Sequence, residues 1–224
     1  MTAAVDEFVS ILQRGPSGCA CVFNPWKDHD ERDAAPRART PEMRRANMAA
    51  YLEARRTHAR VMLLGEAPSH RGCRFTGIAF CSETELVHKA GLVARRPLAL
   101  TSRGASEKPQ RERSAAVIWD EIDHAGCAYE VILWNAFPWH PHAPDDPMTN
   151  RRPRIPEVAQ GRAALGALLA CFTHRLEIFA VGKVAQEAIA AWPEVENAGY
   201  IRHPSMGGEA RFREGFRTLV ASRL

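Results

Sequence analysis

The stretch that decides the fold is residues 61–77, which read Val-Met-Leu-Leu-Gly-Glu-Ala-Pro-Ser-His-Arg-Gly-Cys-Arg-Phe-Thr-Gly. Its first four residues are all apolar, as in a strand of a parallel sheet that is buried on both faces. Gly65 then allows a sharp turn, and Pro68 fixes the path of the chain beyond it. Polar side chains follow directly, at the strand end where open α/β sheets hold their ligands. The stretch therefore predicts a functional site at residues 66–71.

Two other segments end in the same way. Residues 129–135 read Tyr-Glu-Val-Ile-Leu-Trp-Asn and end on the amide of Asn135. Residues 199–205 read Gly-Tyr-Ile-Arg-His-Pro-Ser and carry the imidazole of His203. The carboxyl ends of parallel strands meet at one edge of a sheet, so the three ends predict a single pocket.

Apolar runs and helical patterns alternate along the rest of the chain. We expect strands at residues 61–64, 131–134, 177–181 and 200–201, and helices at residues 2–13, 40–54, 82–91, 114–125, 157–173, from 183, and 209–224. This alternation is typical of a three-layer α/β/α fold with a central four-stranded parallel sheet. The long Pro- and His-rich segment 136–155 is interpreted as a functional loop.

Length and composition favour one domain. The chain has 224 residues, of which 46% are hydrophobic, so residues 1–224 are expected to form a single domain with residues 1–59 packed on it. No apolar stretch approaches the length of a membrane span, and the N-terminus lacks a signal-peptide pattern. We expect a monomeric cytoplasmic protein without a membrane partner, nucleoid-associated if bacterial.

The positive charge is carried mainly by arginine. The formal net charge is +4, and arginine suits bidentate contacts with phosphate groups. The most basic stretch is residues 93–113, and a helix at 40–54 is expected to expose Arg44, Arg45, Arg55 and Arg56. Codon bias remains an alternative origin of the arginine-rich composition, and the basic stretch is alternatively an ordinary solvated loop.

The motifs at the three strand ends resemble those of the uracil-DNA glycosylase superfamily. The resemblance rests on Gly65-Glu66-Ala67-Pro68, Phe75, Asn135 and His203-Pro204-Ser205, and covers residues 60–224. It implies a DNA repair enzyme that flips uracil out of single- or double-stranded DNA and hydrolyses its N-glycosidic bond, without a cofactor. The products are free uracil and an abasic site.

The resemblance assigns catalysis to Glu66 and His203. Breaking the bond builds positive charge on the sugar and negative charge on the departing base, so a carboxylate and a hydrogen-bond donor suit the reaction. Some relatives carry an Asp one residue after the Glu position, where this chain has Ala67. Alternatively, Glu66 caps a local turn, and His203 is an ordinary turn residue.

The resemblance also implies which residues bind the base and the DNA. Substrate binding falls to Gly65, Ala67, Phe75 as the stacking ring and Asn135 as the reader of the pyrimidine edge. DNA contacts fall to Ser69, His70, Arg71, Arg151, Arg152, Arg154, Ser205 and Met206, the last as a wedge. Alternatively, Asn135 ties down loop backbone and Phe75 is a core residue.

Besides Ala67, three further departures from the family pattern are visible. Ser69 stands where some relatives place a bulky ring that excludes the methyl group of thymine, so this exclusion is weaker or comes from elsewhere. Residues 150–156 contain no His, so no covalent DNA adduct is predicted. Of the four cysteines that hold an iron–sulfur cluster in some branches, the third position holds Trp139 and the fourth falls near Gly161. We expect no metal and a colourless protein.

Three alternative functions stay open at this point. A glycosylase of this type can excise another deaminated base, such as hypoxanthine or xanthine. A non-catalytic protein that binds lesions or abasic sites would use the same pocket without releasing a base. A thiol hydrolase built on Cys73 or Cys81 is a third class, although the chain has no recognisable nucleophile motif.

Overall fold

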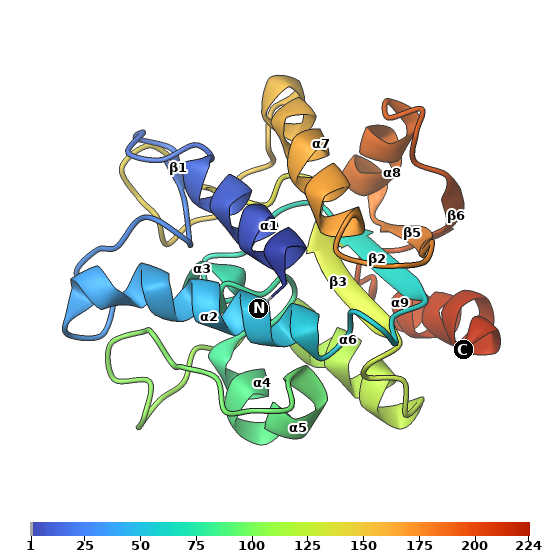
Figure 1. The fold of residues 1–224 in the computed structure, drawn as a ribbon, viewed down its shortest axis with the longest axis horizontal. Coiled ribbons are helices and arrows are strands. Elements are labelled where there is room, and N and C mark those ends of the chain that lie inside the picture. Colours follow the sequence, from blue (N-terminus) through green and yellow to red (C-terminus); the bar gives the residue numbers. More distant parts are fainter. Residues whose placement is uncertain (1) are drawn as a thin grey trace.

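The computed structural model describes residues 2–224. Its centre is a four-stranded parallel sheet of β2 (Val61–Gly65), β3 (Val131–Asn135), β5 (Glu177–Val181) and β6 (Asn197–Ile201) (Figure 1). The strand order is β3-β2-β5-β6. The three-layer α/β/α prediction is confirmed, and β6 begins three residues earlier than the apolar pattern indicates.

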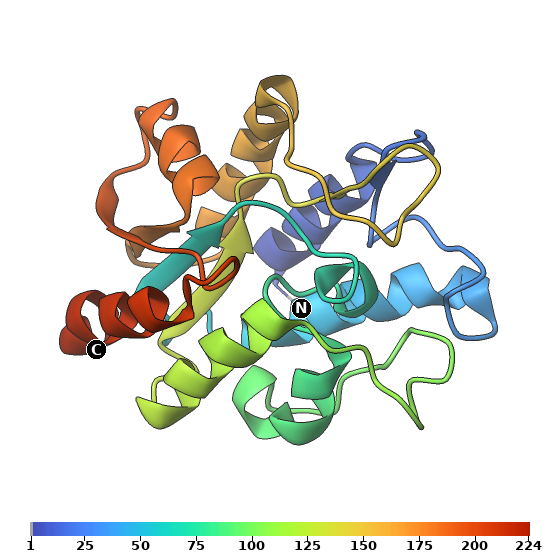
Figure 2. The ribbon, with the colours of Figure 1, turned by 180° about the vertical axis from the view of Figure 1, so that it is seen from behind.

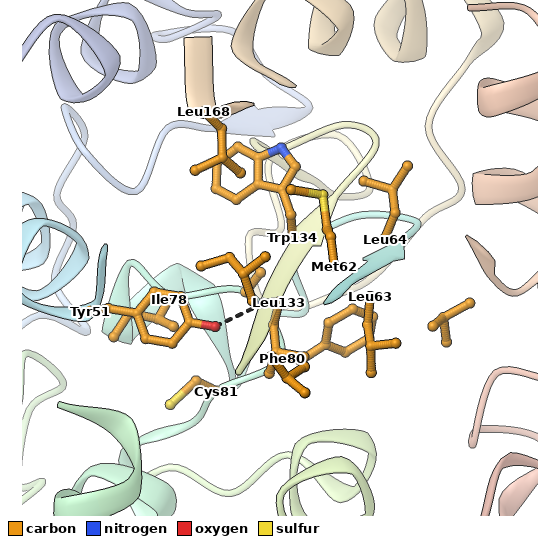
Figure 3. Packing of buried hydrophobic residues seen from close by; sticks show 14 of the residues in the cluster. Tyr51, Met62, Leu63, Leu64, Ile78, Phe80, Cys81, Leu133, Trp134 and Leu168 are labelled. Carbon is orange, nitrogen blue, oxygen red and sulfur yellow. Dashed lines mark hydrogen bonds between the residues drawn. The ribbon is translucent and has the colours of Figure 1, made fainter. Parts of the chain in front are cut away.

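Strand β2 is buried along its whole length, as its apolar run predicts. Met62 and Leu64 point to one side of the sheet, where Trp134 also lies, whereas Leu63 points to the other side near Phe80 (Figure 3). The register places Gly65 directly opposite Asn135. Strands β2 and β3 therefore end side by side, at Gly65 and Asn135.

Helices cover both faces of the sheet. On the face of Trp134 lie α1 (Ala3–Arg14) and α7 (Ile155–Leu169), and the ring of Phe8 in α1 is 5.3 Å from that of Trp134. Helix α8 (Lys183–Ala190) connects β5 to β6. Helices α6 (Arg113–His124) and α9 (Glu209–Gly215) cover the opposite face (Figure 2). The indole of Trp119 in α6 donates to the carbonyl oxygen of Phe80 at 2.9 Å.

The remaining elements frame this core. They are β1 (Val22–Phe23), which pairs with β4 (His140–Pro141), the helices α2 (Thr40–Glu53), α3 (Cys73–Thr76), α4 (Glu83–His88) and α5 (Ala90–Val93), and a 3-10 turn at Arg37–Arg39. The indole of Trp139 donates to the carbonyl oxygen of Leu12 at 3.0 Å and packs on Gly15, where any side chain would collide with it. The Pro- and His-rich segment is thereby joined to α1.

Arg44 in α2 and Arg55 just beyond its C-terminal end are buried, contrary to the sequence prediction. Arg44 forms an ion pair with Asp33 at 2.5 Å, and both side chains are fully buried. The guanidinium of Arg55 donates to five backbone carbonyl oxygens, those of Tyr51, Leu92, Val93, Ala128 and Val131. Buried cations need such partners, and an amphipathic pattern does not reveal them.

Some element ends also differ from the sequence prediction. The helix expected at 82–91 divides at Lys89 into α4 and α5. The last helix gives way to a wider π turn at Phe216–Val220 and a 3-10 turn at Ala221–Arg223. Across residues 2–224, none of the helices is both long and apolar enough to cross a membrane.

Candidate active site

The ends of the parallel strands open into a cavity of about 790 Å³. Strands β2 and β5 are neighbours at the centre of the sheet, and the chain leaves them towards opposite edges, a switch point where α/β proteins bind ligands. The wall consists of Phe80 and five segments: residues 66–71, 111–114, 150–152, 181–184, and 202, 203 and 205. Of the three strand ends singled out in the sequence, those leading to Glu66 and His203 line this cavity, whereas Asn135 is not part of its wall.

Glu66 projects from the end of β2 into this cavity and is half-buried. Burial raises the pKa of its carboxyl above the ordinary value, and the charge of Glu187 adds to this rise. The guanidinium of Arg152 acts in the opposite direction. Glu66 is thus a carboxylate whose charge is only partly compensated and only partly hydrated.

His203 lies across the same cavity with one ring nitrogen fixed. Nδ1 accepts the backbone N–H of Ser205 at 3.1 Å and lies 2.7 Å from its hydroxyl oxygen. A ring nitrogen that accepts a backbone N–H carries no proton, so the neutral imidazole has its proton on Nε2. Burial, helped by the charge of Arg202, lowers the pKa of His203 to about 4. At neutral pH the ring is a neutral donor through Nε2.

The aromatic ring at the cavity is Phe80, which corrects the expectation for Phe75. The Phe80 ring lines the cavity with its centroid 5.9 Å from that of His203. Phe75 is fully buried, stacks on the Arg74 guanidinium at 4.2 Å and lies outside the cavity wall. Both rings follow the same strand, and only tertiary packing decides which one turns towards the strand ends.

Packing around Phe80 explains Gly65. A Cβ atom on Gly65 would lie 2.0 Å from the Phe80 ring, so only glycine leaves room for the ring. Phe80 itself has φ of +50°, a conformation that residues with side chains adopt only when their surroundings hold them there.

Asn135 lies close to Gly65, as the Phe80 ring does, and is not part of the cavity wall. It is 2% exposed, and its Oδ1 atom is buried without a hydrogen-bond partner. Within residues 2–224 no hydrogen bond joins its side chain to loop backbone, so the alternative role as a loop anchor receives no support. A buried acceptor without a donor is costly in a folded protein and suits a ligand that brings an N–H group.

The loop after β2 is braced by the Pro- and His-rich segment. Asn150 Oδ1 accepts the backbone N–H of His70 at 2.9 Å and lies 3.1 Å from its Nδ1 atom. The buried ring of His140 has Nδ1 2.9 Å from the carbonyl oxygen of Pro68. Ala67, Ser69, His70 and Arg71 all reach the cavity. Asn150 could not be identified from the sequence, because an asparagine in a loop carries no spacing signal.

The expected phosphate contacts separate into two groups. Arg152 is exposed at the cavity and pairs with Glu187 at 2.5 Å. Arg151 also reaches the cavity, but its guanidinium is held by both oxygens of Glu157 and by backbone carbonyl oxygens. We therefore reassign Arg151 from DNA contact to loop anchor. Arg154 and Met206 lie outside the cavity wall, and Met206 is 91% exposed.

The cavity wall is rich in cations. Besides Arg151 and Arg152, it includes Arg71, Arg111, Arg113, Lys183 and Arg202. Of the basic stretch 93–113, Arg111 and Arg113 reach this wall, whereas Arg95 stacks on Tyr129 at 4.9 Å. Only the last part of the basic stretch therefore belongs to the site.

The cysteines contribute no chemistry to this site. All six are free, and the part of the chain that the structure describes contains no cluster of three His, Cys, Asp or Glu side chains suited to a metal ion. Burial raises the pKa of both Cys73 and Cys81, and neither lines the cavity. Protonated, buried thiols are poor nucleophiles, which disfavours the thiol-hydrolase alternative.

The sequence beyond the N-terminal segment matches a family of DNA glycosylases. The family model of the uracil-DNA glycosylase superfamily matches residues 53–220. The chain therefore belongs to the uracil-DNA glycosylase superfamily.

A solved structure has the same fold. The crystal structure of wild-type Pedobacter heparinus SMUG2 is similar with a TM-score of 0.61 and 15% sequence identity. The match covers 100% of this chain and 94% of that one, so the N-terminal 52 residues outside the family match also have counterparts there. No curated protein sequence matches the chain.

Proposed function

We propose that this protein removes uracil from DNA by hydrolysing the N-glycosidic bond, leaving an abasic site. The observation that carries the proposal is the pairing of Glu66 with a neutral, Nε2-protonated His203 in one cavity. The two groups match the two charges that develop when the bond breaks.

The roles follow from the electrostatics of each group. The carboxylate of Glu66 stabilises the cationic sugar or orients the attacking water, and partial burial strengthens its field. The Nε2–H group of His203 donates to the uracil carbonyl oxygen that gains negative charge. A neutral donor suits this task, because the imidazole does not have to be protonated before it can stabilise the oxygen.

Base recognition is assigned to Phe80 and Asn135. The Phe80 ring offers a stacking face. We assign the unpaired Oδ1 of Asn135, which lies behind the cavity wall, the N3–H group of a uracil that inserts deeper than this wall. Cytosine has no hydrogen on N3, so it would leave this acceptor unsatisfied and be discriminated against. The same acceptor also fits the N1–H group of hypoxanthine or xanthine, which keeps these bases as alternatives.

The proposal is tested with end-labelled oligonucleotides carrying uracil, hypoxanthine, xanthine or cytosine, single- and double-stranded. Alkali-labile abasic sites should appear fastest with uracil and be absent with cytosine. If hypoxanthine or xanthine is removed faster than uracil, that purine is the substrate and the proposed mechanism still holds. Tight binding of abasic DNA with no new abasic sites would identify a non-catalytic lesion binder.

The stacking role predicts a difference between the two phenylalanines. Phe80→Ala should lower uracil excision by roughly 5- to 150-fold, because stacking on one base contributes about 1–3 kcal/mol. Phe75→Leu should instead lower the melting temperature and leave single-turnover excision near the wild-type rate. The reverse pattern would return the stacking role to Phe75.

The cation-rich wall predicts a salt-dependent affinity for DNA. Arg71 is exposed at the cavity and has no ion-pair partner within residues 2–224, so Arg71→Ala should reduce the slope of log K against log salt by about 0.7–0.9. Arg175→Ala, which removes an exposed arginine outside the cavity wall, is the matched control and should leave the slope unchanged. Equal slopes for both variants would make Arg71 an ordinary surface residue.

A further inference from the structure

Glu112 is a second carboxyl group in the cavity that the mechanism above does not use. It precedes α6 at the N-cap position, yet its side chain makes no capping hydrogen bond. Within residues 2–224 it also forms no ion pair, although Arg111 and Arg113 flank it. Glu112 is therefore neither a helix cap nor a partner of these arginines.

The carboxyl of Glu112 occupies a place that glycine makes available. A Cβ atom on Gly72 would lie 1.8 Å from Glu112 Oε2 and 3.0 Å from Ser69 Oγ. The Ser69 hydroxyl is buried and has no hydrogen-bond partner of good geometry. A carboxyl and a hydroxyl thus lie together on the wall formed by the loop after β2, with hydrogen-bonding capacity to spare.

The surroundings favour the neutral form of the Glu112 carboxyl. Burial raises its pKa to about 7, with Ser69 lowering it and the charge of Glu85 raising it. The pKa values of the thiols of Cys73 and Cys81 are raised by burial and, in addition, by the charge of Glu112. Desolvation therefore dominates the charge state of Glu112.

Other titratable and charged groups line the same cavity as Glu112. Glu66, His70 and Arg71 come from the loop after β2, and Arg151 and Arg152 from the Pro- and His-rich segment. Lys183, Arg202 and His203 come from the segments around β5 and β6. None of these cations contributes to the shift in the pKa of Glu112, which burial dominates.

We propose that Glu112 serves this pocket as a neutral carboxylic acid that donates a hydrogen bond to the flipped base. This inference rests on the proposed function. The donor suits bases that present a carbonyl oxygen to the wall on which Glu112 lies. The departing base becomes negatively charged, so a neutral O–H donor stabilises it and a carboxylate repels it. Glu112 and His203 then supply two donors, and Asn135 supplies the acceptor.

The pH dependence follows from the sign of the shift. A carboxyl with a raised pKa is neutral below that pKa, so its contribution is present below about pH 7 and lost above it. At one pH unit above this pKa, Glu112 remains protonated in about a tenth of the protein molecules. The rate of excision should therefore be about 10-fold lower than at acidic pH. Glu112→Gln keeps an N–H donor at every pH and should remove this alkaline decline. Glu112→Ala should be slow throughout.

The experiment measures two quantities between about pH 6 and pH 8.5 for the wild type, Glu112→Gln, Glu112→Ala and the control Glu107→Gln, an exposed acid of the same basic stretch. One is the single-turnover rate on a uracil oligonucleotide. The other is the affinity for an oligonucleotide carrying 2′-fluoro-2′-deoxyuridine, which resists cleavage, measured against its thymine counterpart. Circular dichroism confirms that each variant is folded.

The proposal expects the wild type and Glu107→Gln to lose rate and uracil-specific affinity above pH 7, and Glu112→Gln to lose neither. An identical alkaline decline in Glu112→Gln, or a wild-type rate in Glu112→Ala at pH 6, overturns it. If no variant releases uracil, the proposed function fails, and the affinity measurement alone still decides on Glu112. Absence of any uracil-specific affinity contradicts both proposals.

Discussion

Replacing His203 with alanine should lower the single-turnover rate of uracil excision by about 10²–10³-fold, as for loss of one donor to a developing oxyanion. The donor acts mainly in the transition state, so the affinity for uracil-containing DNA should change little. Because Nδ1 is held by Ser205, Ser205→Ala should reduce the rate much less: the ring stays in place but loses one of its two fixing contacts. Rapid-quench kinetics with saturating enzyme separates these effects.

A folded His203→Ala protein that retains the full rate would show that His203 is a turn residue and that this mechanism is wrong. The substitution lies at a partly buried position, so its melting temperature is compared with the wild type first. A fall in affinity without a fall in rate would place His203 in DNA binding instead.

Replacing Glu66 with glutamine should lower the rate by about 10²–10⁴-fold, because the amide has a similar shape but carries no negative charge. The same carboxylate charge should make the excision rate fall at acidic pH, which gives the pH profile an acid limb. The pKa of Glu66 is raised, so the active carboxylate is present above that pKa and is lost as the pH falls through it. Single-turnover rates between about pH 4 and pH 7 measure this limb.

Glu187 provides a matched test of the same residue. Its negative charge raises the pKa of Glu66, so Glu187→Gln should move the acid limb to lower pH without abolishing activity. If Glu66→Gln still shows an acid limb at the same pH as the wild type, this limb reports the titration of another group. A Glu66→Gln rate close to the wild type would leave Glu66 as a structural turn residue.

The sheet was predictable because its strands are short, apolar and bounded by polar residues. Strand β5 matches its expected bounds, and β2 and β3 each extend one residue further, to Gly65 and Asn135. The start of β6, Asn197, was missed because its first residues are polar or small. The buried arginines were missed because periodicity does not show where backbone carbonyl oxygens lack donors.

The site was only partly predictable. Glu66 and His203 follow strand ends, so their meeting at one cavity could be expected from parallel topology alone. Phe80 was missed because it lies fifteen residues beyond Gly65, after the short helix α3, where its direction depends on packing against Gly65 and Trp119. Glu112 was missed because it lies within a basic stretch that reads as a solvated loop.

The central claim is that this cavity releases uracil from DNA. Mass spectrometry of the small-molecule fraction, after the wild-type protein has been incubated with a uracil-containing oligonucleotide, tests it most directly. We expect free uracil in an amount equal to the abasic sites formed, and almost none from Glu66→Gln or His203→Ala over the same time. No free uracil from the wild type, or equal amounts from all three proteins, would contradict the account.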